Sequence, residues 1–259
     1  MSSQNDSVKQ TIKVALLLCV ICSVVVSGAA VIFKPMQLAN KDLDRKSNIL
    51  AAAGLLEEGK SVEELFKQIT VKAIDLETGE YTDAVNVETY DPSKAARDPQ
   101  MSSVLDGAED IASIKRRERY ALVYLVEKQG EVEKIILPVR GYGLWSTLYG
   151  FLALEADANT IAGLGFYQHA ETPGLGGEVD NPNWKALWPG KKVYQGESEA
   201  PAIELVKGNV TESTPNAEYK VDSLSGATLT SRGVTNLLQY WLGQEGFGPF
   251  LAKFRSQGA

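Results

Sequence analysis

The chain has 259 residues, with 26 Lys and Arg, 33 Asp and Glu, two Cys and one His. From residue 34 onward it carries 24 basic and 32 acidic side chains, a net charge of −8, which argues against a nucleic acid or anionic lipid surface as partner. The single histidine, His169, excludes a metal site built on imidazoles, and no Walker loop, Rossmann glycine signature or HExxH motif occurs. Conventional catalytic and metal-binding residues are therefore not expected.

The first segment is apolar: the 20 residues from Val14 to Phe33 contain no charge. At about 1.5 Å per helical residue they span roughly 30 Å, the thickness of a bilayer core. A cleavable signal peptide is the competing interpretation, because residues 27–30 are small and Lys9 and Lys13 precede the run. The run exceeds the usual length of a signal-peptide core, so we expect a tail over residues 1–11 and a transmembrane helix over 12–33.

The orientation of this span is left open by its flanking charges, which are basic on both sides, and long domains translocate largely regardless of charge. Cys19 and Cys22 both lie inside the span, so the soluble part can form neither a disulfide nor a thiolate metal site. We interpret them as small apolar residues of a helix.

The segment after the span is predicted to continue helically over 36–56, as a stalk. Ser61 and Glu64 form a capping box that predicts a helix running to Ile69. A strand over 71–76 should end in a turn at Thr78 and Gly79, and a short helix is expected over 108–115.

Two hairpins are then predicted: strands 120–127 and 132–139 joined through Gln129 and Gly130, and strands 148–155 and 160–167. Asn181 and Pro182 indicate the start of a short helix, and strands follow over 203–207 and 219–221. Apolar residues from Val234 to Leu242 indicate an amphipathic helix closed by Gly243. The fold class is therefore α+β: a mostly antiparallel sheet with flanking helices on one N-terminal transmembrane helix, with a stalk and the start of the soluble domain over 34–70 and the remainder over 71–259.

Three glycine-rich stretches follow predicted strands: 140–146 (RGYGLWS), 171–177 (ETPGLGG) and 222–231 (DSLSGATLTS). Glycine permits close backbone approach, and Tyr142, Trp145 and Leu175 could flank a planar ring. Tight turns plugged by aromatic side chains are the alternative.

In the third stretch, Thr228 stands just before a helix expected to begin near Thr230 or Ser231. A phosphate attached to Thr228 would face free backbone donors and the positive end of the helix dipole. Capping of the helix by Ser225, Thr230 or Ser231 explains the hydroxyls equally well.

The segment Ser225-Gly-Ala-Thr228, preceded by Asp222, resembles the flavinylation motif of the FMN-binding domain family, in which the threonine is esterified to the flavin 5′-phosphate. The N-terminal span, 43–50 (LDRKSNIL), 143–150 (GLWSTLYG) and 171–176 (ETPGLG) are similar to the C subunits of Na⁺-translocating NADH:quinone reductases, and this resemblance covers nearly the whole chain.

The resemblance implies a flavoprotein subunit that relays electrons through covalent FMN during NADH oxidation, ubiquinone reduction and coupled Na⁺ export. It implies a single-pass protein of the bacterial inner membrane with a periplasmic domain, five other subunits as partners in a six-subunit complex, and a separate flavin transferase that uses FAD. It makes Thr228 the covalent anchor, Glu171 a neighbour of the polar edge of the ring and Lys207 a counter-charge. The other expected FMN neighbours are Gly141, Tyr142, Gly143, Leu144, Trp145, Thr172, Pro173, Gly174, Leu175, Gly176, Asp222, Ser225, Gly226, Ala227 and Thr230.

Two alternatives remain at this point. One is the paralogous G subunit of the Rnf electron-transport complex, which shares the flavinylated threonine and the anchor. The other is a membrane-tethered binding or assembly module without a cofactor, in which the glycine-rich stretches are turns.

Overall fold

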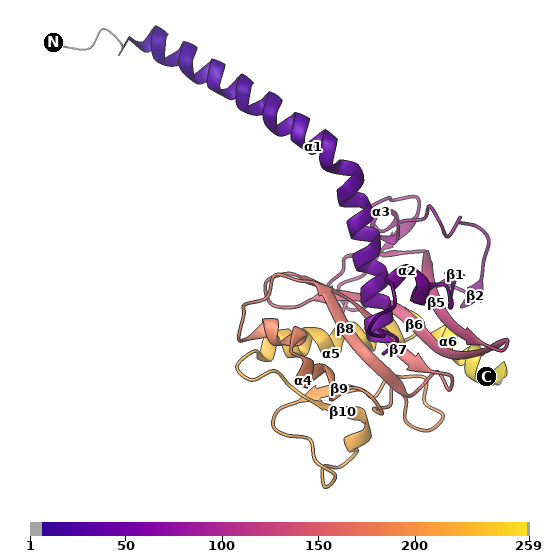
Figure 1. Ribbon diagram of the computed structural model, residues 1–259. Helices are drawn as coiled ribbons and strands as arrows, with labels where there is room; N and C mark the ends of the chain where they lie inside the picture. Colours follow the sequence, from indigo (N-terminus) through magenta and orange to yellow (C-terminus); the bar gives the residue numbers. More distant parts are fainter. Residues whose placement is uncertain (1–6, 258–259) are drawn as a thin grey trace. The chain divides into compact units, whose positions relative to one another are not determined.

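The computed structural model describes residues 7–257, and the chain divides into two compact units, Met1–Arg45 and Lys46–Ala259 (Figure 1). The first unit consists, in its described part, of most of helix α1, Val8–Ala52, with Pro35 inside the helix. By length and composition α1 could cross a membrane. The expected tail over 1–11 lies partly outside the described residues, and its described part is helical from Val8 onward.

The second unit is built on a six-stranded antiparallel sheet, which confirms the predicted fold class. Its strand order is β2-β1-β5-β6-β7-β8, so that both predicted hairpins lie side by side in the sheet. The strands are β1 Ile69–Asp75, β2 Glu80–Tyr81, β5 Tyr120–Lys128, β6 Glu131–Tyr142, β7 Thr147–Glu155 and β8 Ile161–Gln168.

Strand β5 shows how the sequence builds two cores. Its run is almost continuously apolar because both faces of this central strand are covered. Val123 and Leu125 point into one cluster, whereas Leu122 and Val126 point into the other. The sheet is therefore the middle layer of the second unit.

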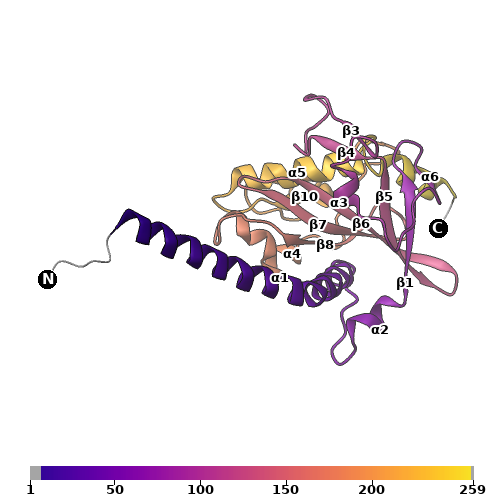
Figure 2. The same cartoon turned by 90° about the horizontal axis from the view of Figure 1, so that it is seen from above.

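Helices α5, Thr228–Leu242, and α6, Gly248–Gln257, cover one face of the sheet (Figure 2). The other face is covered by α2, Val62–Phe66, and by the last turns of α1. Ile49 and Leu50 are fully buried there, and a side chain at Gly163 of β8 would collide with the carbonyl oxygen of Ala52. The stalk therefore ends as part of the domain core.

The smaller elements do not belong to the six-stranded sheet. They are α3 Pro92–Ala95, β3 Ser102–Val104, β4 Arg116–Glu118, α4 Pro182–Lys185, β9 Glu204–Val206 and β10 Lys220–Asp222, with 3₁₀ turns at Gly176–Asp180 and Ala217–Tyr219. Strands β9 and β10 pair in parallel, and β3 and β4 pair antiparallel.

Three local predictions were wrong. The helix after Ser61 ends at Phe66, because the apolar residue Ile69 belongs to β1 and is buried in the sheet. Residues 108–115 form turns instead of a helix, since Ser113 and Lys115 have positive φ and the Asp110 carboxylate accepts the Lys115 N–H. Helix α5 begins at Thr228 itself, before the expected start.

Replacing Leu50 with Ala should lower the free energy of unfolding of the domain by about 2–5 kcal/mol, because it opens a cavity in the core between the sheet and the end of α1. Urea unfolding of the full chain in detergent, followed by tryptophan fluorescence, measures this loss. The control is Leu56→Ala, a position that is 50% exposed, where a change within about 0.5 kcal/mol is expected. Equal effects at the two positions would contradict the burial of the stalk end.

Candidate functional site

The three glycine-rich stretches predicted from the sequence meet at the N-terminal end of α5. The side chain of Glu171 hydrogen-bonds to the loop after β6 and to α5, and a Cβ on Gly226 would lie 3.0 Å from Cδ2 of Leu175. A side chain at Gly233 of α5 would collide with the carbonyl oxygen of Tyr142, so α5 crosses the end of β6 at this glycine. Segments that are far apart in the sequence therefore form one surface.

Thr228 is the first residue of α5 and is exposed. The residue before it, Ala227, has no side chain that could cap the helix, and no capping hydrogen bond is made there. The predicted capping role of Ser225, Thr230 or Ser231 is therefore wrong. The first turn keeps its backbone donors and the positive end of its dipole beside the Thr228 hydroxyl.

Two other hydroxyls of the stretch 222–231, those of Thr230 and Ser231, are buried and form hydrogen bonds within the domain. The Ser231 Oγ accepts the Leu224 N–H at 2.9 Å and donates to the Ala227 carbonyl at 3.0 Å, which folds the loop back on the helix. Asp222 accepts the Val210 N–H at 2.7 Å. Gly226 has a φ of +71°, a conformation that favours glycine. The loop that carries Thr228 is thus held in one conformation.

Glu171 lies behind this surface and is only 5% exposed. Its Oε1 accepts the backbone N–H groups of Leu144, Trp145 and Ser146 at 3.1, 2.9 and 3.2 Å, and its Oε2 accepts the Thr230 hydroxyl at 2.7 Å. The carboxylate is consequently occupied by the protein. Thr230 therefore donates to Glu171 and does not cap the helix, whereas a position of Glu171 near the polar edge of a bound ring stays a prediction.

Two glycines of the predicted motifs are explained by the Glu171 carboxylate. A Cβ on Gly143 would lie 2.7 Å from Oε1, and a Cβ on Gly176 would lie 2.7 Å from Oε2 and 2.6 Å from the Thr230 Oγ1. All three distances are shorter than real Cβ contacts. These glycines leave room for the carboxylate.

The hydrogen bonds also determine the ionisation of Glu171. Burial by itself raises the pKa of this carboxyl, but the Thr230 hydroxyl and the N–H groups of Trp145, Leu144 and Ser146 outweigh it and hold the pKa below its usual value. Glu171 is therefore ionised at neutral pH.

This depressed pKa predicts a pH-dependent stability difference between the wild type and Glu171→Gln. A lowered folded-state pKa contributes stability that is present above the unfolded value of about 4.3 and is lost as the pH falls through the folded value. The wild-type advantage in urea midpoint should therefore be largest near neutral pH and should shrink as the pH is lowered past about 4.3 toward the folded-state pKa. A difference that stays constant over this range would contradict the ionised, hydrogen-bonded carboxylate.

Large apolar side chains are exposed around Thr228. Trp145 is 64% exposed and Leu229 is 52% exposed. A group of exposed apolar side chains beside polar backbone is typical of a ligand-binding surface. We call this group the apolar rim; it consists of Tyr142, Leu144, Trp145, Leu175 and Leu229.

The remaining residues predicted to surround FMN differ in their exposure. Thr172, Pro173 and Gly174 are exposed in the loop before Gly176. Lys207 is exposed directly after β9, whose last residue pairs with Asp222. Gly141 faces α5, since a Cβ there would lie 2.5 Å from Cβ of Leu237, so it is needed for packing.

Sequence reasoning missed the buried ion pair that supports the site. Arg140 donates both terminal nitrogens to the Glu118 carboxylate, at 2.7 and 2.6 Å, and its guanidinium stands 5.1 Å from the Trp241 ring. The Trp241 indole N–H donates to the Arg140 carbonyl at 2.6 Å, which joins α5 to β6. No local pattern marks such a pair, because its members lie in different elements.

His169 is held by its neighbours. Its Nδ1 accepts the Glu171 N–H at 3.2 Å, and its Nε2 lies 2.7 Å from an Asp180 carboxylate oxygen. Both ring nitrogens of this histidine therefore have partners within the protein.

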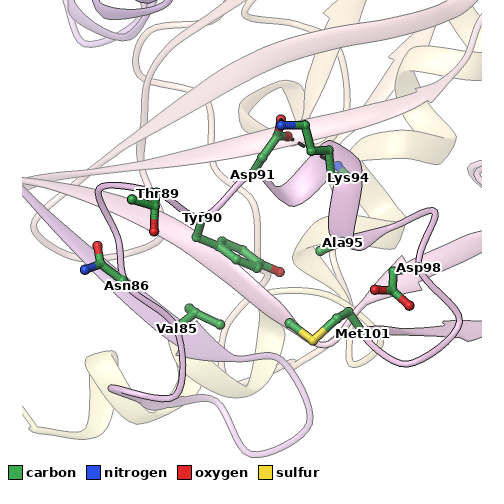
Figure 3. Close-up of a pocket in the computed structure, with 9 residues that line it drawn as sticks. All are labelled: Val85, Asn86, Thr89, Tyr90, Asp91, Lys94, Ala95, Asp98 and Met101. Carbon is green, nitrogen blue, oxygen red and sulfur yellow. Dashed lines mark hydrogen bonds and ion pairs between the residues drawn. The ribbon is translucent and has the colours of Figure 1, made fainter.

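A cavity of about 350 Å³ lies in a different place, beside α3 (Figure 3). The side-chain oxygens of Asn86, Asp91 and Asp98 each accept backbone N–H groups of their own turns, and Tyr90 donates to the carbonyl of Tyr120. These polar groups are already bonded within the protein. We therefore do not place the functional site there.

Comparison with known proteins identifies the family of this chain and supports its fold. The sequence profile of the FMN-binding domain matches residues 143–243, which contain the three glycine-rich stretches apart from residues 140–142. The C subunit of the Na⁺-translocating NADH-quinone reductase of Pseudomonas aeruginosa is 56% identical, over 98% of this chain and 98% of that protein. This chain belongs to the family of these C subunits. The C subunit of the Vibrio alginolyticus reductase is 49% identical, again over 98% of each chain.

Solved structures of this family share the architecture described above. A crystal structure of NqrC from Shewanella oneidensis has a TM-score of 0.77 at 37% identity and covers 84% of this chain and 99% of its own. The structure of the C subunit from Parabacteroides distasonis has a TM-score of 0.65 at 25% identity and covers 87% of this chain and 98% of its own. The predicted family and fold are confirmed.

Proposed function

We propose that this C subunit carries FMN bound covalently through its phosphate to Thr228 and relays electrons within a Na⁺-translocating NADH:quinone reductase. The observation that carries the proposal is the position of the Thr228 hydroxyl, exposed at the uncapped start of α5 and beside the apolar rim. A phosphate and a planar ring need these two kinds of surface next to each other.

The residues present fit FMN. A phosphodiester at Thr228 keeps one negative charge, which the first backbone N–H groups of α5 can meet, and Gly226 allows the chain to approach closely. The apolar rim supplies contacts for the isoalloxazine, and residues 172–174 offer exposed backbone for its polar edge. Lys207 is a further candidate counter-charge.

FMN supplies the chemistry of accepting one or two electrons, and the protein supplies its position and surroundings. Thr228 is a substrate residue for a separate flavin transferase that uses FAD, which requires an accessible hydroxyl, and we assign no catalytic residue to this chain. A covalent tether suits a periplasmic location, where a dissociated flavin could not be recaptured from the cytoplasm.

The same proposal places the chain in the bacterial inner membrane, with α1 as its single span, residues 1–11 as the cytoplasmic tail and the domain in the periplasm. The candidate span and the family support this placement. The partners are then the other subunits of a six-subunit complex that couples NADH oxidation and ubiquinone reduction to Na⁺ export. The relatives favour this complex over the Rnf complex.

The full chain, purified from cells that contain a flavin transferase, should show a fluorescent band in a denaturing gel. Denaturation removes any flavin that is not covalently bound, so the fluorescence reports the linkage itself. The chain from cells without the transferase should be dark. A dark band in both preparations would favour the cofactor-free module instead.

A further inference from the structure

We infer that Glu171 is a positioning residue for the flavin site and that its buried negative charge shifts the flavin toward its oxidised form. The inference rests on the proposed function, because it concerns a flavin at Thr228. Glu171 would act from beneath the ring-binding surface, which we take to be the apolar rim, by holding the backbone in place and by its charge.

The positioning role of Glu171 follows from its hydrogen bonds to two separate segments, the loop after β6 and helix α5. Glu171 receives hydrogen bonds from Leu144, Trp145 and Ser146 in the loop after β6, and from Thr230 in the first turn of α5. Two of these loop residues and the first turn of α5 are parts of the surface around Thr228. One side chain therefore sets the spacing between the helix that carries the anchor and the loop that carries Leu144 and Trp145.

The backbone around the carboxylate is shaped for it. Gly143 and Gly176 stand against opposite oxygens of Glu171, and a Cβ at either position would lie 2.7 Å from its oxygen. A side chain at either position would therefore displace the Glu171 carboxylate from its hydrogen-bond partners. This complementarity indicates a built arrangement and not an incidental contact.

The electrostatic role of Glu171 follows from the neutral groups that hydrogen-bond to its carboxylate. The groups that hydrogen-bond to Glu171 are backbone N–H groups and a hydroxyl, all of them neutral, so they stabilise the carboxylate without cancelling its charge. Its charge acts in a buried setting, where solvent screens it less. A negative charge next to the ring-binding surface opposes the gain of electrons by a ring bound there.

Positioning is tested without flavin, on full chain from cells that lack the transferase. In Glu171→Ala, backbone N–H groups of residues 144–146 lose their acceptor, and hydrogen exchange in that peptide should become at least about tenfold faster. Glu171→Gln keeps one oxygen for these N–H groups and an amide for Thr230, so most of the protection should return. Unchanged exchange in Glu171→Ala would overturn the positioning role.

The charge is tested on the flavin-loaded chain by spectroelectrochemical titration. Glu171→Gln should raise the flavin midpoint potential, because it removes the charge and retains the shape. The matched control is Glu178→Gln, a partly exposed carboxylate on the same segment that bonds to Asn181; its potential should stay near the wild-type value. An unshifted Glu171→Gln potential, or an equal shift in the control, would overturn the electrostatic role.

The two proposals can fail separately. If the wild type holds no covalent flavin, the proposed function and the electrostatic role fall together, whereas the exchange measurement still decides the positioning role. If the flavin is present and both Glu171 variants behave as wild type, only the inference about Glu171 falls.

Discussion

Replacing Thr228 with Val should abolish the fluorescent band in a denaturing gel completely, because valine has the same shape but no hydroxyl to carry the phosphate ester. The fold should survive, since position 228 is exposed at the first turn of α5. The measurement is in-gel fluorescence of the full chain from transferase-containing cells, normalised to protein stain. Intact-protein mass spectrometry gives an independent reading of the same linkage.

The control for this prediction is Thr230→Val, two residues along the same helix. The Thr230 hydroxyl is fully buried and donates to Glu171 at 2.7 Å, so no transferase could reach it in the folded domain. This variant should keep the fluorescent band even though it loses a hydrogen bond. A band that persisted in Thr228→Val and vanished in Thr230→Val would show that the wrong hydroxyl has been chosen.

Replacing Glu118 with Ala should lower the free energy of unfolding by about 3–5 kcal/mol, because it leaves the Arg140 guanidinium, whose side chain is only 15% exposed, without its carboxylate partner. The loss should also loosen β6 from α5, since Arg140 connects them through its carbonyl and the Trp241 indole. Urea unfolding of the full chain in detergent measures the stability. A loss below about 1 kcal/mol would contradict a buried pair.

Two comparisons sharpen this second prediction. Lys253→Gln breaks an ion pair with Glu80 in which both side chains are exposed, so its cost should stay within about 1 kcal/mol. The double variant Glu118→Leu with Arg140→Met removes both charges, and it should recover a large part of the stability lost in Glu118→Ala. Recovery would separate the cost of an unpaired buried charge from the cost of lost packing.

Local patterns in the sequence were sufficient for most of the sheet. The hairpin of β5 and β6 follows from two apolar, β-branched runs around Gln129 and Gly130, and both turn residues have positive φ. The start of α4 follows from Asn181, whose side chain accepts the Asn183 N–H at 2.9 Å. These features depend on neighbours in the chain, so the sequence displays them directly.

The errors at the site have a common physical origin. Thr230 and Ser231 were expected to cap α5 because hydroxyls near a helix start usually do so. In the structure their partners come from elsewhere: Thr230 bonds to Glu171, 59 residues away, and Ser231 bonds to the backbone of the preceding loop. A local rule cannot weigh partners that only the folded chain brings near.

By itself, the sequence determined which residue types were available: a candidate span, an α+β domain with one histidine and no cysteine, and Thr228 in a motif that resembles a flavin anchor. The tertiary structure decided how they are used. It left Thr228 exposed at an uncapped helix start, and it turned Glu171 inward to join a loop and a helix. The reason is that burial and hydrogen bonding depend on distances in space, and these distances cannot be read from the separation of residues along the chain.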